Sequence, residues 1–296
     1  MATDRLTFPL IPVRRNAGVA FGTMRSRRRG IGSETASFRE YQPGDDIRRI
    51  DWNASARLSA ALGRDEFIVR EHYAEQARAV FLAVDRSPSM ALYPDASPWL
   101  SKARAVAACA TLIAAAARAE SCPLGYLDEH GMPRVDPFAR RGAADGLLRD
   151  VRYDRRDGLA AVLADIARPA VPAGAFVFLL SDFVEPVDLE AWHRALAGGT
   201  ELVPVLIQDA RLERSFPDVG GIVLPVAEPG GRCSLVRMSR RRSQELRARN
   251  EDRLHQLLER FAHLGLDWVD VASSDLHQLH RSFFAWANAR RIKEAA

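Results

Sequence analysis

Lysine is almost missing from this chain. Only Lys102 and Lys293 stand among its 42 basic residues, so arginine carries nearly all of the positive charge. Together with the abundant alanine, this indicates a base-composition bias. The net charge of +4 is far from the concentrated basic stripe that a phosphate backbone requires. Nucleic-acid binding through the arginine runs 25–29 and 240–242 is therefore disfavoured, and solvated charge is the simpler interpretation.

Cysteine is also scarce, and no long hydrophobic run is present. Cys109, Cys122 and Cys233 are odd in number and widely spaced, which argues against a disulfide framework or a zinc site. Residues 1–15 lack the apolar core of a secretory signal, and the apolar stretch 105–117 is too short to span a bilayer. The sequence therefore predicts a cytoplasmic protein without a membrane span.

Short apolar runs alternate with helical patterns from residue 79 onward. This alternation predicts an α/β fold with a mostly parallel sheet flanked by helices. We expect strands over 80–84, 124–127, 176–180, 202–207 and 266–271, and a hairpin over 222–226 and 233–237. We expect helices over 98–119, 158–167, 189–196, 242–264 and 274–291.

The first part of the chain has a different character, and we divide the chain into an N-terminal accessory segment, 1–76, and a main domain, 77–296. Residues 38–52 mix charges with large apolar groups such as Tyr41 and Trp52. A short helix could begin at Asp45 and Asp46 after the Pro43-Gly44 turn. Because several large apolar side chains are not left in water together, we expect this segment to pack on the main domain.

Acid and hydroxyl groups follow two of the expected strands. Asp85, Ser87 and Ser89 come after the first strand, and Ser181 and Asp182 end a later one. In a parallel sheet, ligands bind beyond the carboxyl ends of the strands. Hard oxygen ligands with few charges suit Mg²⁺, or Mn²⁺ in its place. The plainer alternative is that Asp85 and Ser87 cap a helix or fix their own turn.

These motifs resemble known families. Asp85-x-Ser87-x-Ser89 with Asp182 is similar to the metal-ion-dependent adhesion site of von Willebrand factor A domains. A longer run, continued by Ser55-Ala56-Arg57 and Val69-Arg70-Glu71, resembles the signature of the domain-of-unknown-function 58 family. That run is Phe38-Arg39-Glu40-Tyr41-Gln42-Pro43-Gly44-Asp45-Asp46-Ile47-Arg48-Arg49-Ile50-Asp51-Trp52.

The resemblance implies a von Willebrand factor A-like, Rossmann-like fold and a non-enzymatic, metal-dependent interaction function. It also implies a partner, a MoxR-type AAA+ ATPase, and a client protein that the pair helps to assemble or mature. A full adhesion site has a threonine where this chain has Asp157, so either Asp157 supplies that oxygen or the site is degenerate and holds no metal. The signature residues expected to contact the partner are Arg39, Tyr41, Asp45, Asp46, Arg48, Asp51 and Trp52.

An enzymatic alternative stays open. Asp85 and Asp182 could serve a metal-dependent phosphatase or nuclease. Phosphatases that use an aspartate nucleophile place a second aspartate two residues later, where this chain has Ser87. No histidine is placed by its sequence neighbours to act as a general base, so the interaction function is the leading hypothesis.

Overall fold

The fold is described from a computed structural model of the 296-residue chain. The described residues are 6–12, 20–21, 29–41, 50–64, 66–73, 76–92, 99–127, 131, 133–136, 151–227 and 233–295. None of the helices within these ranges is long and apolar enough to cross a membrane.

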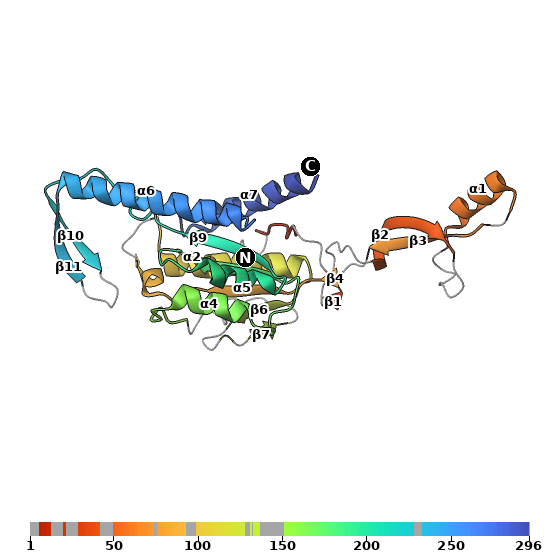
Figure 1. Cartoon of the computed structure of the whole chain (residues 1–296), viewed down its shortest axis with the longest axis horizontal. Coiled ribbons are helices and arrows are strands. Elements are labelled where there is room, and N and C mark those ends of the chain that lie inside the picture. Colours follow the sequence, from red (N-terminus) through yellow and green to blue (C-terminus); the bar gives the residue numbers. More distant parts are fainter. Residues whose placement is uncertain are drawn as a thin grey trace.

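A six-stranded sheet forms the centre of the main domain (Figure 1). Its spatial order is β12-β9-β8-β5-β6-β7, and all neighbours pair in parallel except β6 and β7. The strands are β5 (Val80–Val84), β6 (Leu124–Leu127), β7 (Pro133–Asp136), β8 (Phe176–Ser181), β9 (Glu201–Ile207) and β12 (Val269–Val271). The central strands are continuous apolar runs because they are buried on both faces. The expected mostly parallel α/β sheet is confirmed.

Alternate side chains of each strand enter two separate hydrophobic cores. One core lies between the sheet and the helices α2 (Lys102–Ala119) and α7 (Leu276–Ala295), where Phe8 stacks on Phe283. The other core lies under α4 (Gly158–Ile166), α5 (Leu189–Ala197) and α6 (Arg240–His263). Helices therefore cover both faces of the sheet, and only its edges and strand ends remain for a site.

Two expectations for this domain need correction. Helix α2 begins at Lys102 and not at residue 98, because the Ser101 hydroxyl accepts a hydrogen bond from the Arg104 N–H as its N-cap. Strand β7 was not expected from the sequence. It is a short antiparallel edge strand with Val135 half exposed, so it lacks the continuous apolar run of the buried strands.

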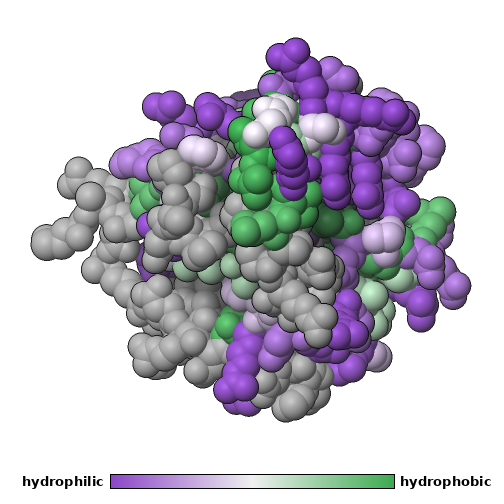
Figure 2. Space-filling view, turned by 90° about the vertical axis from the view of Figure 1, so that its left-hand side faces the viewer, coloured by the Kyte–Doolittle hydropathy of each residue, from purple (hydrophilic) through white to green (hydrophobic). Residues whose placement is uncertain are grey.

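The expected hairpin is confirmed as β10 (Ile222–Ala227) and β11 (Cys233–Met238), which pair with each other. It lies beside the start of α6, away from the six-stranded sheet (Figure 1). Ile222, Val223 and Leu235 expose apolar side chains there. Figure 2, which faces this end of the molecule, shows hydrophobic surface bordered by hydrophilic surface.

Within the N-terminal segment, the elements between Arg29 and Tyr73 form a small unit, whereas Phe8 and Leu10 belong to the core of the main domain. Strands β2 (Arg29–Glu40) and β3 (Ile68–Tyr73) pair antiparallel, and α1 (Trp52–Leu62) contacts β3. The sequence did not predict α1, which begins after Asp51 because the Asp51 carboxylate accepts from the N–H groups of Asn53 and Ala54. The helix envisaged at Asp45 and Asp46 lies outside the described residues.

The expected packing of residues 38–52 on the main domain is wrong for the described part of that run, since Figure 1 places β2, β3 and α1 away from the six-stranded sheet. Part of the apolar surface is covered within the unit. Val69 is buried, and the rings of Trp52 and Phe67 meet edge to face at 6.1 Å. Trp52 nevertheless stays 59% exposed. The short strands β1 (Ala20–Phe21) and β4 (Gln76–Ala77) pair with each other and lie between this unit and the main domain (Figure 1).

Candidate functional site

The candidate site lies where the strand order of the sheet reverses. Strands β5 and β8 are neighbours in space, although β6 and β7 separate them in sequence. The chain after β5 continues the pairing, because the Asp85 N–H donates to the Leu180 carbonyl at 2.9 Å. Helices leave a sheet in opposite directions at such a point, and a crevice opens at the carboxyl ends of the strands.

The Asp85 carboxylate is the centre of a buried hydrogen-bond network. Its Oδ1 accepts from the Ser87 N–H at 2.8 Å and from the Ser87 hydroxyl at 2.5 Å. Its Oδ2 accepts from the Ser181 hydroxyl at 2.5 Å. Burial raises the pKa of Asp85, although the hydrogen bonds from Ser181 and Ser87 oppose this rise. A hydroxyl that gives its proton to a carboxylate keeps oxygen lone pairs free for another ligand.

Ser89 differs from the other two serines. It lies in the short 3-10 helix η3 (Pro88–Ala91), and its Oγ is buried without a hydrogen-bond partner among the described residues. A buried hydroxyl without a partner is costly and uncommon. This oxygen is therefore available to a ligand that the protein itself does not supply.

Asp182 is held by a buried ammonium group that sequence reasoning missed. The Lys102 Nζ donates to Asp182 Oδ2 at 2.6 Å, to Glu213 Oε1 at 2.5 Å and to the Ser89 carbonyl at 3.1 Å. Lys102 is fully buried, and Asp182 is 1% exposed. The scarcity of lysine does not by itself mark Lys102, because the other lysine, Lys293, lies on the surface.

Glu213 follows β9 in the loop 208–216, and no sequence pattern pointed to it. Its Oε2 accepts from the Asp209 N–H at 2.8 Å, while Trp99 Nε1 donates to Asp209 Oδ2 at 2.5 Å. Burial raises the pKa of Glu213, with the Lys102 ammonium acting in the opposite direction. The loop is thus tied to the cluster through Glu213 and Lys102, and also through Gln208, whose Nε2 donates to the Asp182 carbonyl at 2.6 Å.

Helix α4 approaches the Asp85 turn very closely. A Cβ atom added to Gly158 would lie 2.5 Å from Asp85 Oδ1, from the Ser87 nitrogen and from Ser87 Oγ. Only glycine fits there. The first turn of α4 therefore packs directly on the carboxylate, where the positive end of the helix dipole stabilises negative charge.

Asp157, expected in place of the threonine, does not enter this cluster. Its side chain is 68% exposed, and its carboxylate lies 3.4 Å from the Arg155 guanidinium. It does act at a distance, because Glu185 has a pKa raised first by burial and then by the charges of Asp85, Asp182 and Asp157. Asp157 and Glu185 thus form an acidic rim around the buried cluster.

The cluster offers carboxylate and hydroxyl oxygens, with the Lys102 ammonium between Asp182 and Glu213. Its available atoms are oxygens, which Mg²⁺ and Mn²⁺ prefer. The buried ionisable side chains around it are the acids Asp85, Asp182, Asp209 and Glu213 and the bases Arg86 and Lys102. Across the described ranges, no three His, Cys, Asp or Glu side chains converge on one point. Any cation here must therefore rely on serine hydroxyls, and Ser89 Oγ fits that need.

The structure shows other roles for some histidines. His255 lies 3.2 Å from Glu259 on α6, and the His280 ring contacts the Thr7 carbonyl at 2.8 Å.

The residues expected to contact a partner lie in the N-terminal unit, apart from this site. Arg39 pairs with Val69 in the β2–β3 ladder, and the Tyr41 N–H donates to the Phe67 carbonyl. Asp51 is the N-cap of α1, and Trp52 is its first residue. Asp45, Asp46 and Arg48 lie outside the described residues.

The fold and the site together define a class of protein. It is an α/β protein with a buried cluster of acidic and hydroxyl side chains at the point where the strand order of the sheet reverses. Within that class, the chain matches the family described as "Protein of unknown function DUF58" over residues 37–256, and it belongs to that family.

Curated relatives include uncharacterized proteins of Mycobacterium bovis and Mycobacterium tuberculosis, each 32% identical over 209 residues. The match covers 68% of this chain and 62% of each relative, so the chain spans less than two thirds of their length.

Two solved structures show a distant likeness. One is the conserved hypothetical protein BatB from Bacteroides thetaiotaomicron, with 15% identity and a TM-score of 0.37. The other is an aerotolerance-related membrane protein from Bacteroides fragilis, with 14% identity and a TM-score of 0.38. Each alignment covers 71% of this chain and 98% of the other. At these scores, the likeness carries no argument about function.

Proposed function

We propose that this protein is a non-enzymatic interaction module of the von Willebrand factor A type, which binds a partner carboxylate through a divalent cation. Ser87 and Ser89 would hold Mg²⁺ or Mn²⁺ through their hydroxyl oxygens, and Asp182 would act directly or through water. Asp85 would orient and polarise the Ser87 hydroxyl, with which it is already hydrogen-bonded. Asp157 would act from the rim by its charge.

The observation that carries this proposal is the buried Ser89 Oγ, which has no hydrogen-bond partner among the described residues and lies beside buried carboxylates. A bound divalent cation supplies an electrophilic centre with a coordination position for an outside carboxylate. A cation would give Ser89 Oγ a partner and would balance the buried carboxylates. The protein's own residues would then position and dehydrate the site, without a group that attacks a substrate.

Calorimetric titration with Mg²⁺ and Mn²⁺ tests this site. Wild type should bind one divalent ion, and Ser89→Ala should weaken binding at least tenfold with little change in the melting temperature of the metal-free protein. Ser215→Ala is the matched control, because the Ser215 hydroxyl donates to Glu251 on the exposed surface. Equal affinity of Ser89→Ala and wild type would contradict the proposal. Phosphoesterase activity abolished by Asp85→Asn would favour the enzymatic alternative.

We further propose that the N-terminal unit binds a MoxR-type AAA+ ATPase, and that the two act together on a client protein. The support is the Trp52 ring, 59% exposed at the start of α1 within the family signature. Trp52→Ala should weaken binding of such an ATPase from the same genome and lower the melting temperature only slightly, since the ring is mostly exposed and contacts Phe67 edge to face. Ile292→Ala, which removes an exposed side chain at 70% on α7, is the control. Unaltered ATPase binding in Trp52→Ala would exclude this face.

A further inference from the structure

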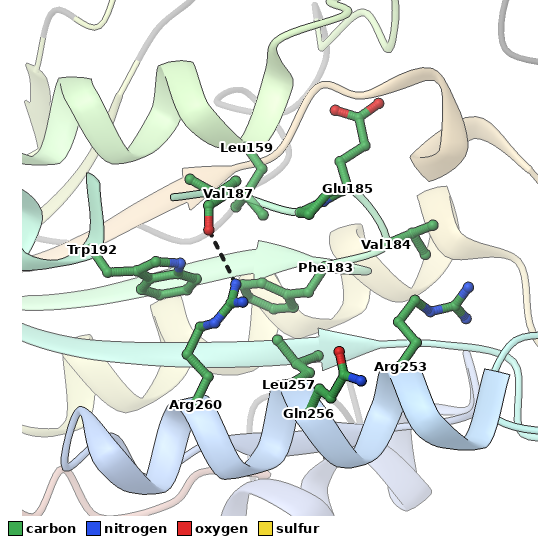
Figure 3. Close-up of a pocket in the computed structure, with 11 residues that line it drawn as sticks. Leu159, Phe183, Val184, Glu185, Val187, Trp192, Arg253, Gln256, Leu257 and Arg260 are labelled. Carbon is green, nitrogen blue, oxygen red and sulfur yellow. Dashed lines mark hydrogen bonds between the residues drawn. The ribbon is translucent and has the colours of Figure 1, made fainter. Parts of the chain in front are cut away.

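A cavity lies beside the candidate metal site, between helix α6 and the loop that follows β8 (Figure 3). Its volume is about 80 Å³. Pockets for drug-sized ligands and cofactors measure about 300–1,000 Å³, so this cavity has room for one side chain and not for a cofactor. Phe183 and Leu257 supply its apolar walls.

Two buried N–H groups at this cavity lack acceptors among the described residues. One is the Nε1 of Trp192, whose side chain is 1% exposed, and the other is the Nε of Arg253. Both side chains line the cavity, Trp192 toward one end and Arg253 toward the other (Figure 3). Because unsatisfied buried donors are costly, the cavity is suited to an occupant that accepts hydrogen bonds.

The cavity is also electropositive. The Arg260 guanidinium lies between Trp192 and Phe183 in Figure 3, where its Nη1 donates to the Val187 carbonyl at 3.1 Å. Arg253 adds a second cation. The Glu185 carboxylate points away from both arginines (Figure 3), and its raised pKa reflects burial and then the charges of the acidic cluster. Donors, cations and apolar walls together define a receptor for a carboxylate on a short apolar stem.

A continuous chain of contacts joins this cavity to the metal site. The Ser181 hydroxyl donates to Asp85 Oδ2 and accepts from the Phe183 N–H at 2.9 Å. Phe183 holds a left-handed backbone conformation with φ of 50°, which is strained for an aromatic residue. The strained turn places Asp182 on the metal side and the Phe183 ring on the cavity side. One partner segment could therefore reach both positions.

We propose that this cavity receives an aspartate or glutamate side chain of the partner, next to the carboxylate that binds the metal. The proposal rests on the proposed function and names the partner chemistry, a segment with two neighbouring acidic residues. The stem would lie on Phe183 and Leu257, and the carboxylate would accept hydrogen bonds from Trp192 Nε1 and the Arg260 guanidinium. A hydrogen bond to a charged group contributes about 1.5–3 kcal/mol, which corresponds to roughly tenfold or more in affinity.

The indole N–H signal of Trp192 in a ¹H–¹⁵N correlation spectrum reports on the cavity directly. The chain has five tryptophans, and Trp192→Phe identifies the signal by its disappearance. N-acetylglutamate amide is the probe, and N-acetylglutamine amide is the matched neutral control. The glutamate probe should shift the Trp192 signal along a saturating curve, and the glutamine probe should not. Arg260→Gln should weaken the glutamate response about tenfold or more.

Measuring in chelator, and again in Ser89→Ala, separates this proposal from the metal site. The Trp192 response should persist in both conditions, because the cavity groups are not metal ligands. A metal site without a Trp192 response would overturn the cavity proposal alone. Equal shifts with the two probes, or no shift up to the solubility limit, would overturn the proposal, because the cavity would then not select a carboxylate.

Discussion

Replacing Lys102 by methionine tests the electrostatics of the candidate site most directly. The substitution keeps the length of the side chain and removes an ammonium that lies 2.6 Å from Asp182 Oδ2 and 2.5 Å from Glu213 Oε1. Both carboxylates are buried and would be left without their cation. Removing one partner of a buried ion pair costs about 3–5 kcal/mol.

That loss corresponds to a fall in melting temperature of roughly 6–20 °C for a domain of this size. Lys293→Met is a fitting control, since Lys293 is the other lysine of the chain and pairs with Asp267 at 2.5 Å on the surface. A surface pair contributes about 1 kcal/mol or less. Urea unfolding and calorimetry would compare both variants with wild type.

Two further measurements make the result specific to charge. Adding Glu213→Gln to Lys102→Met removes one unpaired anion and should restore part of the lost free energy of unfolding. Mg²⁺ should stabilise Lys102→Met more than wild type, because the cation replaces the missing charge. A loss for Lys102→Met no larger than that for Lys293→Met would refute the buried cluster.

Three other substitutions test the packing and the capping of the structure, and the first two have a matched control variant. Gly158→Ala should lower the free energy of unfolding by about 1–3 kcal/mol and weaken Mg²⁺ binding, because its Cβ would lie 2.5 Å from the Asp85 carboxylate. The control is Gly198→Ala, which has open space around its Cβ and should change the free energy of unfolding by about 0.5 kcal/mol or less. Leu257→Asp should lower the free energy of unfolding, measured by chemical denaturation, by at least about 3 kcal/mol, since this core side chain is only 8% exposed. The control Leu235→Asp changes a side chain that is 77% exposed and should have little effect on that free energy. Asp51→Ala removes the N-cap of α1 and should cost about 1 kcal/mol of local stability, seen as faster amide exchange in α1. Unchanged exchange would mean that the cap is not formed.

The sequence alone predicted the sheet because its central strands are buried on both faces. Such strands appear as continuous apolar runs, and Val80–Val84 and Phe176–Ser181 are examples. The edge strand β7 escaped prediction because exposure weakens that pattern. Helix α1 escaped for another reason, since its start depends on a cap at Asp51 inside a run read as a partner-binding signature.

The candidate site was predicted in part. Asp85, Ser87, Ser89 and Asp182 follow strands that a parallel sheet must bring together, and the structure places them at one edge. Asp157 was expected beside them from its spacing alone, but its side chain turns toward Arg155. Spacing along a loop does not determine where a side chain points.

What the sequence by itself determined is the sheet and the residues at its strand ends, because periodicity and burial are local properties of the chain. Only the tertiary structure brought Lys102, at the start of α2, to Glu213, in the loop after β9, 111 residues away. Only the tertiary structure formed the cavity between α6 and the turn at Phe183. Both features depend on how separate elements pack, and packing distances are not encoded in any local pattern.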